Sequence, residues 1–294
     1  MNWKSMIYNE RFPKSNNYNP EFVAENQMGP NSLWLMEWLT EKIEIKEHMK
    51  VLDLGCGRAM SSIFLAKEFG ATVYATDLWI DVSENNKRIV EYGLEDKIIP
   101  IKAEAHALPF AKNFFDVIVA VDSYGYFGTD DLYLSYITSF LKPEGIMAAA
   151  LPGLMQDFDN FKVPDHLLLQ QENGHVFWEP DNFTFHTKDW WFSHWMKTSL
   201  VEVETNDTLE DGYKYWAKQE KALELAGLSI FPSVEETLLK DAGRYIGFVR
   251  IVAKKSEAKT GESMPHPWQP EFSSVCETIF RERDSRKETK TKRS

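Results

Sequence analysis

Short apolar runs alternate with segments of helical periodicity through the first half of the chain. Five runs predict strands, at residues 50–54, 71–76, 97–102, 115–121 and 146–151. Apolar residues recur at helical spacing between them, at residues 59–69, 82–92 and 130–140. Strands that alternate with helices are typical of a parallel sheet with helices on both faces. The pattern therefore predicts an α/β fold, with the uninterrupted run 115–121 in the centre and the strand that contains Pro100 at an edge.

The pattern changes after residue 151. Residues 152–187 have no regular period and are rich in aromatic and turn residues, so we expect an irregular insertion over the open end of the sheet. The later elements are predicted as helices at 187–198, 213–226 and 234–242 and as a strand hairpin formed by 201–205 and 245–253. Ahead of the sheet, residues 31–43 predict an amphipathic helix, and we expect residues 1–45 to form a helical lid across the carboxyl ends of the strands. The polar residues 256–294 predict a disordered tail, which leaves residues 1–255 as a single domain.

The composition argues against several classes of protein. The chain has 294 residues, of which 43% are hydrophobic, and its formal net charge is −12. An acidic chain is not attracted to nucleic acid or anionic lipid, so neither is expected as a partner. Only two cysteines, Cys56 and Cys276, are present, so we expect neither a disulfide framework nor a metal site. The N-terminus lacks a secretory signal and no stretch approaches the roughly 18 to 20 apolar residues of a membrane span, which together predict a cytoplasmic protein.

Two glycines, Gly55 and Gly57, follow the first predicted strand. In a doubly wound sheet the ligand binds at this turn, and glycine allows the backbone to approach it closely. Met60 stands where the dinucleotide fingerprint G-x-G-x-x-G has its third glycine, and the carboxylate of Asp53 would repel a phosphate. The turn therefore favours a cationic ligand over a dinucleotide, with a dinucleotide reductase as an alternative. Cys56, between the glycines, is interpreted as a small packing residue.

Acidic residues follow three further predicted strands. Asp77 ends the second strand, at a position from which a carboxylate accepts hydrogen bonds from both hydroxyls of a ribose. Glu104 follows the third strand, where it would accept from an adenine amino group. Asp122 follows the fourth strand, and two roles stay open for it: a cap for the next helix, or part of the wall of the cofactor or acceptor pocket. His106 is interpreted as a surface residue.

Taken together, the motifs D-L-G-C-G, A-E-A-H-A-L-P-F, F-D-V-I and L-K-P-E-G resemble those of a class I S-adenosylmethionine-dependent methyltransferase. The similarity is to small-molecule methyltransferases of the quinone-biosynthesis and cyclopropane-fatty-acid-synthase-like type, and it covers residues 51–151, about a third of the chain. A-E-A at 103–105 departs from the commoner G-D-A. The resemblance implies a Rossmann-like sheet of seven mostly parallel strands, with the last strand antiparallel.

The resemblance also implies S-adenosylmethionine as the cofactor. The cofactor-binding residues expected on this basis are Asp53, Gly55, Gly57, Asp77, Leu78, Glu104, Ala105 and Asp122. Asp53 and the backbone of residues 55–57 would lie near the methionine, and Asp77 would lie at the ribose. Glu104 with Ala105 would contact the adenine, and either Leu78 or Trp79 would pack on the purine.

Candidate catalytic residues lie in and near the aromatic-rich insertion. His186, set among aromatic residues, is a candidate general base, and Tyr124 is a second candidate; Tyr18 and Tyr126 are comparable. We expect at least two aromatic residues between 177 and 195 either to contact the acceptor or, on the alternative interpretation, to pack in the core. The predicted function is in-line methyl transfer to a small-molecule acceptor. The alternatives are an RNA or protein methyltransferase and a non-catalytic S-adenosylmethionine-binding protein, and exposed aromatic residues would permit a homodimer.

Overall fold

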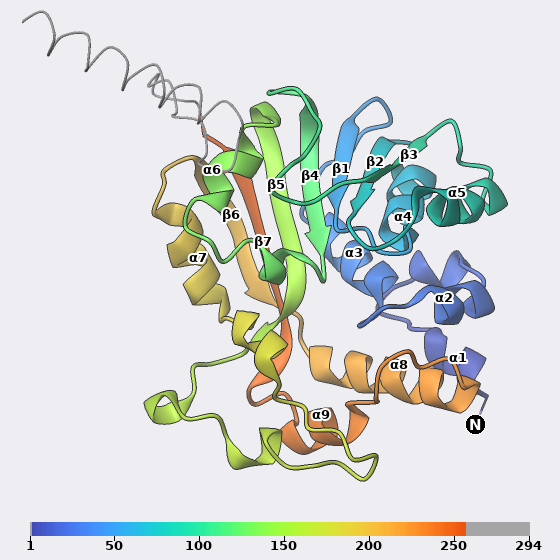
Figure 1. Ribbon diagram of the computed structural model, residues 1–294, viewed down its shortest axis with the longest axis vertical. Coiled ribbons are helices and arrows are strands. Elements are labelled where there is room, and N and C mark those ends of the chain that lie inside the picture. Colours follow the sequence, from blue (N-terminus) through green and yellow to red (C-terminus); the bar gives the residue numbers. More distant parts are fainter. Residues whose placement is uncertain (1, 257–294) are drawn as a thin grey trace, which may run out of the picture.

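The computed structural model describes residues 2–256, and the expected tail 256–294 lies outside this part of the chain except for its first residue. The strands are β1 (Lys50–Leu54), β2 (Thr72–Asp77), β3 (Ile98–Lys102), β4 (Phe115–Val121), β5 (Leu141–Leu154), β6 (Val201–Thr208) and β7 (Ile246–Lys255). They form one seven-stranded sheet in the order β3-β2-β1-β4-β5-β7-β6 (Figure 1). β1 to β5 are parallel, and β7 runs antiparallel between β5 and β6. The predicted Rossmann-like sheet with an antiparallel last strand is confirmed.

Side chains that alternate along the central strands separate two hydrophobic cores, one on each face of the sheet. Val51 and Val117 face a core that includes α4 (Met60–Phe69) and α8 (Gly212–Ala226). Their neighbours in the sequence face the second core, which includes α6 (Tyr133–Thr138) and α7 (Lys188–Met196). Because both faces are covered, β4 carries an apolar residue at every position except Asp116. Pro100 lies in β3 at the edge of the sheet, as predicted.

Two boundaries differ from the sequence prediction for the same reason. The predicted helix 130–140 is the shorter α6, and β5 begins at Leu141, ahead of the Lys-Pro-Glu-Gly turn. Leu141 pairs with Phe115 of β4, and the register then shifts before Val117. Pairing with a neighbouring strand therefore incorporates a turn sequence into β5 that local periodicity assigns to the end of a helix.

The prediction of an N-terminal lid is wrong for the main helix of that segment, which was expected at residues 31–43. The segment contains α1 (Trp3–Ile7), α2 (Pro20–Asn26) and α3 (Ser32–Thr40). Every residue of α3 from Leu33 to Thr40 is buried, and the helix contacts α4, β4 and β5 on one face of the sheet. Six of the nine residues of α3 are apolar, and its buried Glu37 accepts hydrogen bonds from Ser15, so the helix has no face that needs solvent, as a lid would. The segment between α2 and α3 takes the place expected for the lid.

The insertion after β5 is irregular, as predicted, although β5 itself continues to Leu154. Within residues 155–187 the structure has three short 3-10 helices, Asp159–Phe161, Asp165–Leu167 and Pro180–Thr184. The second of them contacts α9 (Glu235–Asp241), beyond the carboxyl ends of the strands (Figure 1). None of the helices within residues 2–256 is both long enough and apolar enough to span a membrane.

Candidate functional site

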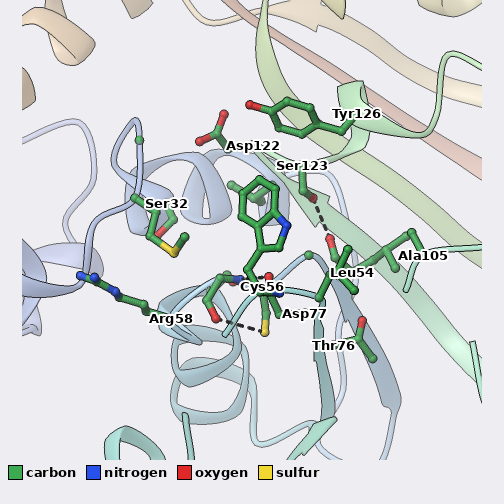
Figure 2. A pocket seen from close by; sticks show the side chains of 18 of the residues that line it. Ser32, Leu54, Cys56, Arg58, Thr76, Asp77, Ala105, Asp122, Ser123 and Tyr126 are labelled. Carbon is green, nitrogen blue, oxygen red and sulfur yellow. Dashed lines mark hydrogen bonds between the residues drawn. The ribbon is translucent and has the colours of Figure 1, made fainter. Parts of the chain in front are cut away.

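A pocket of about 540 Å³ opens at the carboxyl ends of β1, β2 and β4 (Figure 2). Its walls come from residues 26–30, Ser32, the loop after β1, the end of β2, residues 103–106 and the loop after β4. Asp181 of the insertion and Phe231, which follows α8, complete its rim. A volume in this range is typical of sites that enclose a small molecule, and open α/β sheets bind ligands at this edge.

The loop after β1 needs glycine at both predicted positions. Gly55 has φ of +74° and Gly57 has φ of +52°, in the left-handed region that costs other residues free energy. A Cβ on Gly55 would lie 2.5 Å from Cβ of Ser123, which projects from the loop after β4. The amides of Gly55 and Cys56 both donate to the carbonyl of Thr76, at 2.9 Å each. The turn is therefore held against β2 while its outer surface borders the pocket.

Asp77 lines the pocket, and both of its carboxylate oxygens already accept hydrogen bonds from the backbone. Oδ1 accepts from the amides of Trp79 and Ile80 at 2.8 and 2.9 Å, and Oδ2 accepts from the amide of Gly57 at 2.8 Å. A carboxylate offers about four acceptor positions, so one remains on Oδ2. Asp77 is thus oriented by three amides and keeps capacity for a ligand hydroxyl.

Asp53 does not reach the pocket. It is 1% exposed, and its Oδ2 accepts from the hydroxyls of Ser61 and Ser62 in α4, both at 2.6 Å. Burial raises the pKa of Asp53 to about 6, although these two hydrogen bonds oppose the shift. The observed role of this side chain is to attach α4 to the end of β1 beneath the glycine turn.

The residues expected around the adenine border the pocket together. Leu78 is 50% exposed and Trp79 is 71% exposed, so both present apolar surface to a ligand. Glu104 lines the same pocket, but it accepts from the amide of His106 at 2.8 Å and approaches the Nδ1 of that ring at 2.7 Å. Ala105 accepts a hydrogen bond from Tyr133 through its carbonyl oxygen. The sequence interpretation of His106 as a surface residue is incomplete, since this side chain lines the pocket beside Glu104.

Asp122 and Tyr126 border the pocket near the loop after β4 (Figure 2). Asp122 has φ of +54°, which is uncommon for a residue other than glycine. Burial raises its pKa to about 7. The pKa of Tyr126 is raised to about 12 by burial and then by the charges of Asp122 and Asp181. The structure therefore brings two carboxylates and a phenol to one part of the pocket.

The other candidate catalytic residues lie elsewhere. His186 stacks on Trp190 with ring centroids 3.6 Å apart, and burial lowers its pKa to about 4. Tyr124 is fully buried and packs against Trp191 and Trp195, and burial raises its pKa. Tyr18 is buried as well and donates to Glu68 at 3.2 Å. None of these side chains lines the pocket.

The aromatic residues between 177 and 195 pack in the interior or lie away from the pocket. Trp191 and Trp195 are 0% exposed and belong to the core on the α7 face of the sheet. Phe177 belongs to the opposite core, with Trp178 and Phe185 packed against it. The core alternative is the one that the structure bears out for these residues, because helical spacing directs Trp191 and Trp195 to the same face of α7.

The sequence did not predict that residues between the first helices and the main N-terminal helix line the pocket. Met28 and Gly29 line the pocket, and a Cβ on Gly29 would lie 2.5 Å from Oδ2 of Asp122. Arg58 also lines it and donates to the carbonyl of Glu25 at 2.6 Å. The Gly-Pro pair at positions 29 and 30 indicates a turn, but nothing local places that turn against the loop after β4. Within residues 2–256, no group of three or more His, Cys, Asp or Glu side chains is arranged to hold a metal ion.

Comparisons with known proteins agree with this geometry. Methyltransferase GfsG of Streptomyces halstedii is 32% identical over 119 residues, which are 40% of this chain and 42% of that protein. Sterol 4-C-methyltransferase strm-1 of Caenorhabditis elegans is 30% identical over 108 residues, 36% of this chain and 32% of that protein. The chain thus matches less than half the length of either curated relative.

Solved structures share the fold. Geranyl diphosphate C-methyltransferase of Streptomyces coelicolor A3(2), in complex with Mg2+, geranyl diphosphate and S-adenosyl-L-homocysteine, superimposes with a TM-score of 0.58. The sequence identity is 16%, and the superposition covers 75% of this chain and 78% of that one. The family described as Methyltransferase domain matches residues 51–145, which include the glycine turn, Asp77, Glu104 and Asp122. Over residues 51–145, the chain is therefore similar to the methyltransferase domain family.

Proposed function

We propose that this protein is an S-adenosylmethionine-dependent methyltransferase that acts on a small-molecule acceptor. The observation that carries the proposal is the glycine turn held against Asp77 at the floor of a 540 Å³ pocket. The family match over residues 51–145 and the likeness of the fold to a methyltransferase with a bound demethylated cofactor support it.

The residues present fit such a cofactor at several points. The free acceptor position on Asp77 suits a ribose hydroxyl, and the exposed surfaces of Leu78 and Trp79 suit the purine. Arg58 beside the glycine turn suits the methionine carboxylate. Glu104 has one contact from His106 on each carboxylate oxygen, so it keeps acceptor positions that suit the adenine amino group, with the backbone around Ala105 beside it. Asp53, beneath the turn, would act by positioning α4.

The cofactor supplies an activated methyl group on a sulfonium, so the chain chiefly has to align the acceptor and exclude water. Tyr126, Phe127 and Phe231 line the pocket and provide apolar walls for this purpose. The concave pocket and its limited volume favour a small acceptor over RNA or a protein chain, whose recognition would need a broad complementary surface. A cytoplasmic location and a homodimer remain predictions from the sequence.

Isothermal titration calorimetry tests the cofactor, with S-adenosylmethionine, S-adenosylhomocysteine and NADH as ligands. We expect saturable binding of the first two at one site per chain and a flat titration with NADH. Binding of NADH alone would instead support the dinucleotide reductase. Transfer of labelled methyl groups to a panel of thiols, phenols, amines and carboxylates then separates an enzyme from a non-catalytic cofactor-binding protein.

A further inference from the structure

The pocket carries an excess of negative charge on its walls. The carboxylates that line it are Asp77, Glu104, Asp122 and Asp181. Arg58 is the lone Lys or Arg among the described lining residues, and its guanidinium donates to the carbonyl of Glu25. An anionic acceptor would be repelled by such walls, whereas a cation would be attracted.

The side chain of Asp122 is available to a ligand. Asp77 and Glu104 accept hydrogen bonds from protein donors, but Asp122 accepts none from the described part of the chain. Its main chain is fixed, because its amide donates to the carbonyl of Ala150 at 2.9 Å and its φ is +54°. Strained backbone of this kind persists where the surrounding structure imposes it, commonly at functional sites.

The surroundings of Asp122 are small or aromatic on the side that faces the pocket. The Cα of Gly29 lies so close that a Cβ there would be 2.5 Å from Oδ2, which leaves room for the carboxylate only because that residue is glycine. Burial raises the pKa of Tyr126, and the charges of the nearby Asp122 and Asp181 add to that rise. Figure 2 shows Asp122 and Tyr126 on one side of the pocket and Asp77 on the other.

We propose that Asp122, assisted by Asp181 and the aromatic rings of Tyr126 and Phe127, binds the cationic nitrogen of the acceptor, so that the substrates are small amines with an apolar body. The inference rests on the proposed function and assigns Asp122 to the acceptor rather than to the cofactor. Carboxylates and aromatic faces are the groups that recognise ammonium ions.

The chemistry of the step balances without a further reactant. The bound ammonium first gives one proton to the carboxylate of Asp122, which leaves a nitrogen with a free electron pair. That pair forms the new N–CH₃ bond as the S–CH₃ bond breaks and its electrons return to sulfur. The product is a methylated ammonium and a neutral thioether, and Asp122 then releases its proton to solvent. A carboxyl whose pKa lies near 7 is suited to accepting and releasing a proton at neutral pH.

The test uses the full-length protein with benzylamine, phenethylamine and cyclohexylamine as probes, each matched with its alcohol and carboxylate counterpart. We expect at least one amine to bind the S-adenosylhomocysteine-loaded protein and to be methylated at least about tenfold faster than its alcohol, the ratio that one charge-assisted hydrogen bond provides. Asp122→Asn should lower the affinity for that amine by about tenfold or more and leave the affinity for S-adenosylhomocysteine within about twofold of the wild-type value.

Two further variants keep the result interpretable. Asp181→Asn should lower the affinity for the same amine by a smaller factor, which provides an independent measurement if the Asp122→Asn variant folds poorly. Asp159→Asn removes the same charge from an exposed residue of the insertion that does not line the pocket, and it should change nothing.

Three results would overturn the inference. The first is an equal loss of affinity for the amine and for S-adenosylhomocysteine in the Asp122→Asn variant, which would assign the carboxylate to the cofactor. Another is faster methylation of the alcohols or carboxylates, and the third is no binding of any amine to cofactor-loaded protein. Failure to bind S-adenosylhomocysteine at all would instead contradict the proposed function.

Discussion

The amide of Gly57 donates a 2.8 Å hydrogen bond to Oδ2 of Asp77, twenty residues later in the chain. With Oδ1 held by the amides of Trp79 and Ile80, the carboxylate joins the glycine turn after β1 to the loop after β2. The two loops that border the proposed cofactor site are therefore oriented by one side chain. Because that side chain is itself part of the pocket wall, its charge serves both the loops and the ligand.

Asp77→Asn tests this double role. The amide group of asparagine cannot accept with its nitrogen, so one of the backbone donors loses its partner, and the charge that orients a ribose hydroxyl is lost. We expect the affinity for S-adenosylmethionine to fall by about tenfold or more, since hydrogen bonds to charged groups contribute about 1.5–3 kcal/mol. Calorimetry measures the change. Asp81→Asn, at the exposed N-cap of α5 (Val82–Glu91), is the matched control and should bind as the wild type does; equal affinities for all three proteins would contradict the role of Asp77.

Gly55→Ala tests the close approach of the turn to the loop after β4. The new Cβ would lie 2.5 Å from Cβ of Ser123 at a φ of +74°, so a loop must move in addition to the backbone strain. We expect a loss of more than about 2 kcal/mol in the free energy of unfolding, together with weaker cofactor binding. Gly93→Ala has a similar φ of +63° but no atom within 4 Å, and should cost only about 1 kcal/mol. Urea denaturation of both variants distinguishes strain from collision, and similar losses would show that the collision has no effect.

The raised pKa of Asp122 predicts that the stability of the protein falls as the pH rises. Its pKa is raised to about 7 in the folded protein from an ordinary value of 3.8, so the native state holds a proton that the unfolded state has lost between these two values. Its contribution to stability is therefore full below about pH 4 and is lost as the pH rises towards 7. Asn resembles the protonated form, so Asp122→Asn should match the wild type at pH 4.5 and be more stable at pH 8. Allowing for solvent in the pocket, the gain should be about 1–2 kcal/mol.

Urea denaturation at the two pH values measures this difference, with Asp159→Asn as the control. The control side chain is exposed, and its variant should follow the wild type at both pH values. Burial also raises the pKa of Asp53. The wild type and every variant that keeps Asp53 should therefore still lose some stability as the pH rises. A stability difference for Asp122→Asn that is the same at pH 4.5 and pH 8 would contradict the assignment of the shift.

Arg250 connects α3 to the late strands from inside the fold. The guanidinium is 3% exposed, forms a two-point ion pair with Asp207 at 2.9 and 2.6 Å, donates to the carbonyl of Trp38, and lies 4.4 Å from the ring of Trp38. Arg250→Met removes the donor to the buried carbonyl of Trp38 and the partner of Asp207, whose side chain is 41% exposed and can be solvated, so we expect the free energy of unfolding to fall by about 1–3 kcal/mol. Arg244→Met, at an exposed position before β7, should change it by less than about 0.5 kcal/mol. Denaturation that gives equal values for the two variants would show that the hydrogen bonds and ion pair of Arg250 have no net effect on stability.

His186 is predicted to have no part in proton transfer. Its ring stacks on Trp190 outside the pocket, and its lowered pKa of about 4 keeps it neutral at pH 7. His186→Gln should therefore leave kcat within about twofold, whereas Asp122→Asn should lower it with an amine acceptor. Steady-state kinetics with the amine identified above decides between them. A loss of about a hundredfold in kcat for His186→Gln, with unchanged cofactor affinity, would return the base assignment to this histidine.

The sequence by itself determined the order of the elements, the parallel sheet and the position of the glycine turn. These features depend on local signals, because apolar runs, helical spacing and paired glycines are patterns within a few consecutive residues. Asp77 and Leu78 could be placed in the pocket because they follow a strand, and the carboxyl ends of parallel strands share one edge of the sheet.

Only the tertiary structure decided which side chains at that edge face the ligand. Asp53 follows the same strand rule but turns inward to Ser61 and Ser62, and the tryptophans of α7 fill a core instead of an acceptor site. Gly29 approaches Asp122, which lies 93 positions later in the chain, because α3 packs on the sheet. Burial and contact between distant segments depend on how whole elements pack, and no local pattern of residues encodes that arrangement.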